Sequence, residues 1–254
     1  MDLDNKYGTL EMQEALLVLL EEFDAFCLKE NIKYSLSSGS LLGAVRHQGF
    51  IPWDDDLDCI MDRENVNKLR KAIVDHNKLR LESCTESALW IERVRLRDSE
   101  NKGLYQPTLD VFIADNCPDN KIKAQVKLLA IKTLQGMMKY HLSLRKGSLI
   151  MKICSFVTYV MGLPFSHQRK YKWYNRVAQW GNNKTSKFVE LYNDQWYAVG
   201  YKYPREAFVT VERRKFEDAE IYAFTNYHMY LSILYGPNYM TPPKEEDRKP
   251  IHMK

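Results

Sequence analysis

Four aspartates fall within the five positions 54–58, and the chain then enters the apolar segment 57–61. Carboxylates this close repel one another and raise each other's pKa unless a cation neutralises them. In a strand, alternate side chains share a face, so Asp56 and Asp58 point one way and Leu57 the other. Two carboxylates on one strand face are oxygen ligands suited to Mg²⁺ or Mn²⁺. We therefore expect a divalent cation at the start of this strand.

A third carboxylate is expected from a neighbouring strand, and Asp110 is the best candidate. It is the one acid inside the apolar segment 109–114, LDVFIA. A carboxylate there is unfavourable unless it binds a metal or accepts a hydrogen bond. Asp115 is a weaker candidate because it begins an expected loop. We predict that Asp56, Asp58 and Asp110 form the catalytic, metal-binding set.

The phosphate-binding part is predicted at Gly39 and Ser40, between an expected strand at 33–38 and a short helix. Backbone N–H groups at such a position can hold a phosphate. Arg46 ends the short helix and Arg97 lies in a strand with a basic edge. Both are expected to contact the phosphates of a substrate. Phosphoryl transfer needs the two parts together, a metal on the reacting oxygens and amides on the other phosphate.

The residues alone leave other interpretations open. A run of aspartates is also typical of a solvated acidic turn, and Arg97 is equally typical of a plain surface edge. Trp53 could stack on a base or a cationic head group, although packing beneath the loop is commoner for a tryptophan. The glycine–serine pair upstream and Asp110 downstream favour the metal–phosphate site. A calcium-sensing loop fits poorly because its twelve-residue spacing, with a central glycine and a terminal glutamate, is missing.

Hydrophobic periodicity predicts an α+β fold in which strands come first and helices are inserted later. Strands are expected at 33–38, 57–61, 90–97, 109–114 and 208–216. Helices are expected at 10–30, 41–46, 63–77, 121–140, 150–162 and 227–235.

Charge is strongly segregated along the chain. Residues 120–189 contain no Asp or Glu but fourteen Lys or Arg, and their apolar stretch 153–165 is too short to span a bilayer. This segment suits an anionic membrane surface or a phosphate-bearing substrate, so it could face the membrane or the acceptor. The alternative is a solvated basic helix pair beside a buried core helix. We therefore divide the chain into a catalytic core at 1–119, a basic helical insertion at 120–189, and a part at 190–254 that completes the core domain.

Composition excludes several classes of protein. A chain of 254 residues with 45% hydrophobic and 28% charged residues is not extensively disordered. A net charge of +4 argues against a dedicated nucleic-acid binder. Five cysteines without a CxxC pair, and no visible signal peptide, favour a reducing compartment. The expected location is the cytoplasm, with peripheral contact at the cytoplasmic face of the membrane left open.

The segment SLSSGSLLGAVRHQGFIPWDDDLD, residues 35–58, resembles the LicD family, relatives of the fukutin and fukutin-related transferases. LDVFIAD at 109–115 and the tail at 203–243 support the resemblance. It implies a nucleotidyltransferase-like mixed β-sheet flanked by helices, with metal held by acids on adjacent strands. It also implies transfer of a phosphorylated alcohol, such as phosphocholine, from a CDP-linked donor to a hydroxyl of a cell-surface glycan or its lipid-linked precursor.

Carried over residue by residue, the resemblance assigns the metal acids to Asp56, Asp58 and Asp110. It assigns the phosphate turn to Gly39 and Ser40. Ribitol, glycerol or ethanolamine phosphate remain alternatives to phosphocholine, and lipopolysaccharide and teichoic acid are both candidate glycans. Two other functions stay open: transfer of a nucleoside monophosphate from a triphosphate, and non-catalytic glycan binding. Release of CMP or of pyrophosphate distinguishes the two reactions.

Overall fold

The computed structural model describes residues 5–82, 91–98, 106–142, 148–181, 185–194, 196 and 198–252. It divides the chain into two compact units. The first comprises Met1–Glu82, Glu92–Ile113 and Tyr203–Lys254, and the second comprises Ser83–Ile91 and Ala114–Lys202. The second unit encloses the basic insertion predicted at 120–189. The predicted α+β class, with a curled mixed sheet flanked by helices, is confirmed.

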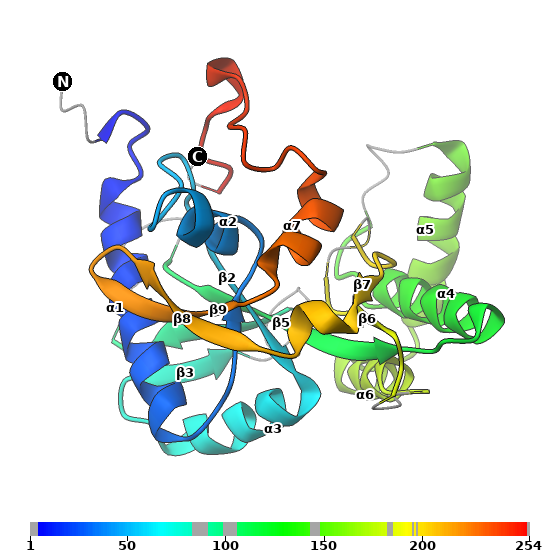
Figure 1. Ribbon diagram of the computed structural model, residues 1–254. Coiled ribbons are helices and arrows are strands. Elements are labelled where there is room, and N and C mark those ends of the chain that lie inside the picture. Colours follow the sequence, from blue (N-terminus) through cyan, green and yellow to red (C-terminus); the bar gives the residue numbers. More distant parts are fainter. Residues whose placement is uncertain are drawn as a thin grey trace. The chain divides into compact units, whose positions relative to one another are not determined.

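The first unit is built on a sheet with strand order β1-β2-β5-β4-β3. These strands are β1 (Ser35–Leu36), β2 (Leu57–Asp62), β3 (Leu79–Glu82), β4 (Glu92–Leu96) and β5 (Leu109–Cys117). Figure 1 labels β2, β5 and β3 of this sheet. The pairs β1·β2, β3·β4 and β4·β5 are antiparallel. Because β2 and β5 are neighbours, the strands that carry Asp58 and Asp110 lie side by side.

The helices of the first unit are α1 (Leu10–Lys29), α2 (Ser38–Arg46), α3 (Arg63–Ala72) and α7 (Tyr227–Tyr235). Of these, α2 and α3 contact strand β2 of the sheet. On α1 the buried residues Leu16, Leu20, Phe23 and Cys27 recur at helical spacing, as the sequence predicts.

A hairpin of β8 (Val211–Phe216) and β9 (Ala219–Phe224) completes the unit. It is joined to β1, since the backbone N–H of Phe224 donates to Ser35 Oγ at 2.8 Å. The remaining short elements are η2 (Ile73–Asp75), β7 (Tyr203–Pro204), η3 (Arg205–Phe208) and η4 (Glu245–Asp247).

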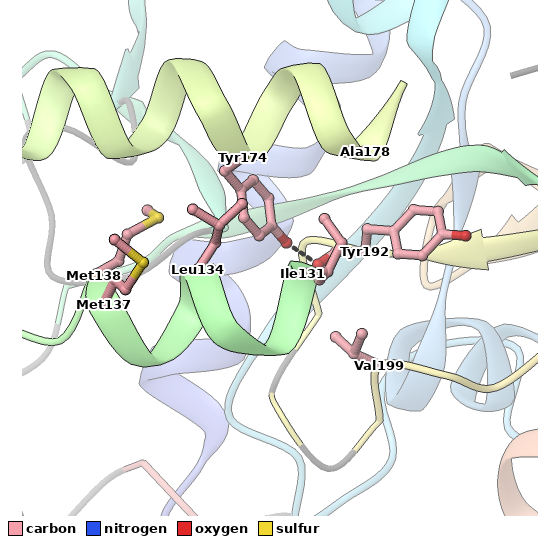
Figure 2. Close-up of a cluster of buried hydrophobic side chains, with 8 residues drawn as sticks. All are labelled: Ile131, Leu134, Met137, Met138, Tyr174, Ala178, Tyr192 and Val199. Carbon is pink, nitrogen blue, oxygen red and sulfur yellow. Dashed lines mark hydrogen bonds between the residues drawn. The ribbon is translucent and has the colours of Figure 1, made fainter. Parts of the chain in front are cut away.

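The second unit contains α4 (Lys121–Met137), α5 (Leu149–Gly162), α6 (His167–Ala178) and β6 (Phe188–Leu191), which pairs antiparallel with the end of β5. Figure 2 shows its core. Tyr174, on α6, donates its hydroxyl to the carbonyl of Tyr192. The buried members of this core are Ile131, Leu134, Met137, Met138, Tyr174, Ala178, Tyr192 and Val199.

Two lysines of the basic segment are buried in the second unit. Lys127 donates to the carbonyl of Asn116 at 3.1 Å and lies 4.2 Å from the Tyr192 ring centroid. Lys170 donates to the carbonyl of Met137 at 3.0 Å. The basic segment is therefore not wholly solvated, because carbonyl oxygens and an aromatic face replace water around these two ammonium groups.

Among the described residues, no single helix has both the length and the hydropathy needed to cross a membrane. The pair α5 and α6 meets those two requirements jointly, with a bend of 116° between the helices.

Several predicted boundaries are wrong. The strand expected at 33–38 is only β1, the helix expected at 63–77 ends at Ala72, and the helix expected at 121–140 ends at Met137. The strand expected at 90–97 is β4, and Trp90 lies outside the described residues. The sequence analysis missed β3, α6, β6 and β9, whereas the terminal helix at 227–235 is confirmed as α7.

Candidate active site

The candidate site lies in the first unit, where β1, α2 and β2 meet. Antiparallel pairing sets Leu36 opposite Cys59, so the chain leaves β1 beside the start of β2. The N–H of Ser37 donates to the carbonyl of Asp58 at 3.0 Å. The buried hydroxyl of Ser40 accepts from the N–H of Asp58 at 2.9 Å. The backbone N–H and carbonyl of Asp58 are therefore both hydrogen-bonded. These two bonds fix the position of the Asp58 backbone, from which its partly buried side chain extends.

The predicted phosphate turn is the first turn of α2. That helix begins at Ser38, whose φ of 46° lies in the left-handed region, rather than at Leu41 as predicted. The N–H groups of Gly39 and Ser40 precede the first intrahelical bond, from the Leu41 N–H to the Ser37 carbonyl. They are therefore available to an anion, although the Ser40 hydroxyl is already used by the backbone of Asp58.

Gly39 is required by close approach of the acidic run. A Cβ at this position would lie 2.6 Å from Asp54 Oδ2. That oxygen is buried without a hydrogen-bond partner among the described residues. Burial and the neighbouring Asp56 raise the pKa of Asp54 well above its usual range. The acidic loop and the first turn of α2 therefore form one packed unit.

The loop between α2 and the acidic run is held by contacts with α2 and with the β8–β9 hairpin. A Cβ on Gly43 would lie 2.4 Å from the carbonyl oxygen of Gly49, so the helix and the returning loop touch through backbone. Glu217, at the turn of the β8–β9 hairpin, accepts from the N–H of Phe50 at 2.8 Å. The Glu217 N–H in turn donates to the carbonyl of Gln48 at 2.8 Å. The hairpin therefore supports the loop that carries the aspartates.

Asp55 is buried and holds the C-terminal segment over the site. Its carboxylate accepts from the N–H groups of Ile251, at 3.2 Å, and His252, at 2.7 Å. The imidazole Nδ1 of His252 lies 3.3 Å from Asp55 Oδ1 and 3.4 Å from Asp56 Oδ2. The C-terminal segment accordingly ends close to α2 in Figure 1. Sequence analysis missed His252, which no local motif marks.

Arg93 is a second residue that the sequence analysis missed. It pairs with Asp110 in the β4–β5 register, and its Nε donates to Asp110 Oδ1 at 2.7 Å. Burial raises the pKa of Asp110, and Arg93 opposes that rise. Burial also raises the pKa of Asp56, which His252 opposes and Asp110 reinforces. Asp56 and Asp110 therefore share one electrostatic environment, as their predicted role requires.

The donor chemistry of this cluster fits a hard divalent cation. Carboxylates come from neighbouring strands, and Asp54 adds an oxygen without a partner. Within the described residues, however, no three acidic, histidine or cysteine side chains are disposed to hold a metal ion together. Asp110 faces Arg93 and Asp56 faces His252 instead. The assignment of Asp56, Asp58 and Asp110 as metal ligands stays a prediction.

The two predicted phosphate-binding arginines lie in different places. Arg46 donates to the carbonyl of Tyr239 at 3.1 Å, beside α2, and so contacts the segment after α7. Arg97 donates to the carbonyls of His76, at 2.8 Å, and Val74, at 3.1 Å. It therefore joins the end of β4 to η2, and no hydrogen bond joins it to the carboxylates within the described residues.

Trp53 stands beside the acidic run and carries a cation on its ring. The guanidinium of Arg248 lies 5.2 Å from the ring centroid. The rings of Tyr7, at 5.7 Å, and His47, at 6.4 Å, meet Trp53 edge to face. The indole is partly buried, so both interpretations drawn from the sequence, packing and cation stacking, describe part of its surroundings.

Comparison with known proteins places this site in a family. Residues 31–126 match the family described as LicD/FKTN/FKRP, nucleotidyltransferase domain. The chain is 29% identical over 265 residues to the lipopolysaccharide cholinephosphotransferase LicD of Haemophilus influenzae, an alignment that covers 96% of this chain and 95% of that protein.

Two uncharacterized rickettsial proteins are similar over shorter lengths. RP689 of Rickettsia prowazekii is 33% identical over 42% of this chain and 41% of its own length. RT0683 of Rickettsia typhi is 50% identical over 21% of this chain and 18% of its own length. The family match spans Gly39 to Asp110, and similarity to the Haemophilus protein extends over nearly the whole chain. The predicted resemblance to the LicD family is thus confirmed: residues 31–126 match its nucleotidyltransferase domain, and nearly the whole chain is similar to the Haemophilus protein.

Proposed function

We propose that this protein transfers a phosphorylated alcohol, phosphocholine first of all, from a CDP-linked donor to a hydroxyl of a cell-surface glycan or its lipid-linked precursor. The observation that carries the proposal is the position of three carboxylates: Asp58 lies on β2, Asp110 lies on the neighbouring strand β5, and Asp56 directly precedes β2. The first turn of α2 is hydrogen-bonded to the backbone of Asp58. The name of the Haemophilus relative supports phosphocholine and a lipopolysaccharide acceptor. The donor and the metal dependence rest on the chemistry of the site.

The donor diphosphate would bind at the first turn of α2. The backbone N–H groups of Gly39 and Ser40 would hold its non-reacting phosphate, because a helix N-terminus favours negative charge. Asp56, Asp58 and Asp110 would hold Mg²⁺ or Mn²⁺, and the bound metal would neutralise charge on the leaving phosphate. Arg93 supplies a fixed positive charge to the same cluster through Asp110.

The reaction balances without a further reagent. The acceptor hydroxyl oxygen forms a bond to the phosphorus distal to the nucleoside, and the bond between that phosphorus and the bridging oxygen breaks. CMP leaves and a phosphodiester remains on the glycan. The hydroxyl proton passes to a carboxylate, and Asp110 is the proposed acceptor because burial raises its pKa and so favours its protonated form.

Choline is supported by the surroundings of Trp53. A guanidinium already lies over this indole, and a quaternary ammonium would be attracted to the same face by the same ring quadrupole. Choline binding there requires Arg248 to move off the ring. Ethanolamine, glycerol and ribitol phosphates are the alternatives, and the neutral alcohols would gain nothing from an aromatic face.

The test is product analysis with a panel of CDP-choline, CDP-ethanolamine, CDP-glycerol and CDP-ribitol, each with a lipid-linked saccharide acceptor and Mg²⁺ or Mn²⁺. We expect CMP and a phosphodiester product by mass spectrometry, with choline the preferred alcohol. Asp58→Asn should abolish turnover and keep the fold, because asparagine has nearly the same shape as aspartate and the hydrogen bonds from Ser37 and to Ser40 involve the Asp58 backbone. Asp75→Asn, at an exposed position of η2, is the matched control.

Three outcomes would overturn the proposal. Pyrophosphate released from a nucleoside triphosphate would support nucleotidyl transfer instead. Glycan binding without product, and without calorimetric binding of Mg²⁺ or Mn²⁺, would support a non-catalytic relative. An active Asp58→Asn variant would exclude the arrangement of carboxylates on which the proposal depends.

A further inference from the structure

Helix α5 of the second unit carries its large apolar side chains on the outside. Eight of them between Leu149 and Met161 are 44–73% exposed, and Leu163 directly after the helix is 62% exposed. Gly162 is the only one of the fourteen helical residues that is buried. The exposed apolar set, called here the α5 apolar face, is Leu149, Ile150, Met151, Ile153, Phe156, Val157, Val160 and Met161.

The side of α5 that packs on α4 is small and polar. A Cβ on Gly136 would lie 2.1 Å from Thr158 Oγ1, and one on Gly162 would lie 2.2 Å from the Met137 carbonyl. Lys139 donates its Nζ to Ser155 Oγ at 2.7 Å. In a water-soluble protein the apolar side of a helix faces the interior and the polar side faces water. On α5 this orientation is reversed, so the exposed side fits an apolar medium.

The positive charge of the same unit indicates which apolar medium the α5 apolar face would enter. The segment 120–189, which includes α4, α5 and α6, has no acidic residue, so its cations have no carboxylate partner within it. Exposed cations of α4 and α6 are Lys121, Lys123, Arg169, Lys172 and Arg176. Such a combination of apolar and cationic side chains complements an anionic lipid surface.

Helix length decides between spanning a bilayer and lying on it. The fourteen residues of α5 extend about 21 Å, which is shorter than a hydrocarbon core of about 30 Å. The next helix, α6, turns away by 116° and carries Arg169 and Lys172 on its exposed side. Trp180, just after α6, is 45% exposed, and tryptophan favours the level of the lipid head groups.

We propose that α5 lies in the boundary between head groups and acyl chains of an anionic bilayer. The α5 apolar face enters the acyl region, and the exposed lysines and arginines of α4 and α6 contact phosphate head groups. This surface shares no residue with the carboxylate cluster, and its test needs no transferase activity. Membrane binding and the proposed reaction can therefore fail independently.

The first experiment is co-sedimentation of the full chain with phosphatidylcholine vesicles that contain or lack phosphatidylglycerol. We expect binding to the anionic vesicles that weakens as salt is raised. Phe156→Ser combined with Val160→Ser should lower the partition coefficient at least about tenfold, because both lost side chains belong to the inserted surface. Val74→Ser combined with Val209→Ser is the matched control, since those valines are 66% and 67% exposed in the first unit.

A fluorescent label at Cys154 gives a direct readout of insertion. Cys154 lies on α5 and is exposed, whereas Cys27, Cys59 and Cys117 are buried. In a Cys84→Ser background, an environment-sensitive dye on Cys154 should shift to shorter wavelength when anionic vesicles are added. Lys121→Gln with Lys123→Gln should weaken binding to anionic vesicles. Lys127 is buried and is left unchanged.

The inference is overturned by any of four results. The serine variant could bind vesicles as well as the wild type, or the dye could stay unshifted while the protein binds. Failure of the wild type to bind anionic vesicles would also reject it. Sedimentation equilibrium that shows self-association of the wild type, lost in the serine variant, would assign the α5 apolar face to a second copy of the chain instead.

Discussion

Arg93 and Asp110 face each other across β4 and β5, with Arg93 Nε 2.7 Å from Asp110 Oδ1 and Nη2 3.3 Å from Oδ2. The two side chains are 24% and 19% exposed, so the pair is largely withdrawn from water. The carboxylate that the sequence analysis assigns to a metal is thus neutralised by a guanidinium. A divalent cation at the proposed site must share Asp110 with Arg93 or displace it.

Arg93→Met should destabilise the protein by about 1–3 kcal/mol, because it leaves a largely buried carboxylate without its partner. A divalent cation would supply the missing positive charge. Mg²⁺ should therefore raise the melting temperature of Arg93→Met more than that of the wild type. Thermal unfolding followed by circular dichroism, with and without Mg²⁺, measures both effects.

Arg95→Met is the control for that prediction. Arg95 lies on the same strand and pairs with Glu82 at 2.9 Å rather than with Asp110. Its loss should destabilise the fold without making stability more sensitive to Mg²⁺. Equal responses of the two variants to Mg²⁺ would contradict a metal site at Asp110.

Gly43→Ala should destabilise the protein, although alanine normally favours a helix interior by about 1 kcal/mol over glycine. The new Cβ would lie 2.4 Å from the Gly49 carbonyl, and backbone cannot swing away as a side chain can. We expect a loss of about 2 kcal/mol in urea unfolding.

Gly49→Ala provides the comparison for Gly43→Ala. Its Cβ would meet the carboxylate end of Glu217, which is flexible, at 2.0 Å. That variant should lose less stability by itself, and Glu217→Ala should relieve its clash. A Gly43→Ala protein as stable as the wild type would show that α2 and the loop are not in backbone contact.

The strand–helix–strand unit around the aspartates was predictable because it is local in sequence. Gly39, Asp56 and Asp58 lie within twenty residues, although Asp56 lies directly before β2 rather than on it. Strand β5 was predictable for a similar reason, since its apolar run is continuous. The packing of Gly39 against Asp54 was not predictable, because it is a tertiary contact.

The partners of the carboxylates could not be read from the sequence. Arg93 reaches Asp110 through the register of β4 against β5, whereas the residues considered from that basic strand were Arg95 and Arg97. Alternation along the strand does place Arg93, Arg95 and Arg97 on one face. The sequence did not show how β4 pairs with β5, so it could not show which of these arginines meets Asp110. His252 reaches Asp55 from nearly two hundred residues away, and no local pattern marks it.

The missed elements have physical causes as well. Helix α6 (HQRKYKWYNRVA) is rich in charge, and only Lys170, Tyr174 and Ala178 are buried, so its apolar stripe is narrow. Strand β3 is four residues long and alternates weakly. The reversed orientation of α5 could not be inferred, because hydrophobicity alone does not show which side of a helix meets the protein.

Arg70→Met should be among the more destabilising single changes in the first unit. Arg70, on α3, donates to Glu92 of β4, with Nε 3.0 Å from Oε1, and Glu92 is 2% exposed. Removing the arginine leaves a buried carboxylate, which costs about 3 kcal/mol or more. Urea unfolding at neutral pH measures the loss.

Lys68→Met is the matched control on the same helix. Lys68 pairs with Glu64 at 3.3 Å, and both side chains are well exposed. Such a pair contributes about 0.5 kcal/mol or less. If the two variants lost similar stability, the contact between α3 and β4 would not depend on the buried charge pair.

Cysteine reactivity should separate Cys154 from the other described cysteines. Burial and the Glu190 carboxylate raise the pKa of Cys117 to about 12, and its Sγ donates to Glu190 Oε1 at 3.0 Å. Burial also raises the pKa of Cys27 and Cys59 well above the usual value. A thiol reacts as its thiolate, so these three groups stay protonated and unreactive at pH 8.

A Cys84→Ser protein should therefore release one equivalent of thionitrobenzoate from Ellman's reagent at pH 8, and four after unfolding in guanidinium chloride. Glu190→Gln removes the negative charge beside Cys117, which should lower the pKa of that thiol. Burial still opposes ionisation, so Cys117 should react slowly in that variant and only as the pH is raised. Rapid release of more than one equivalent from the native Cys84→Ser protein would mean that a thiol described as buried is open to solvent.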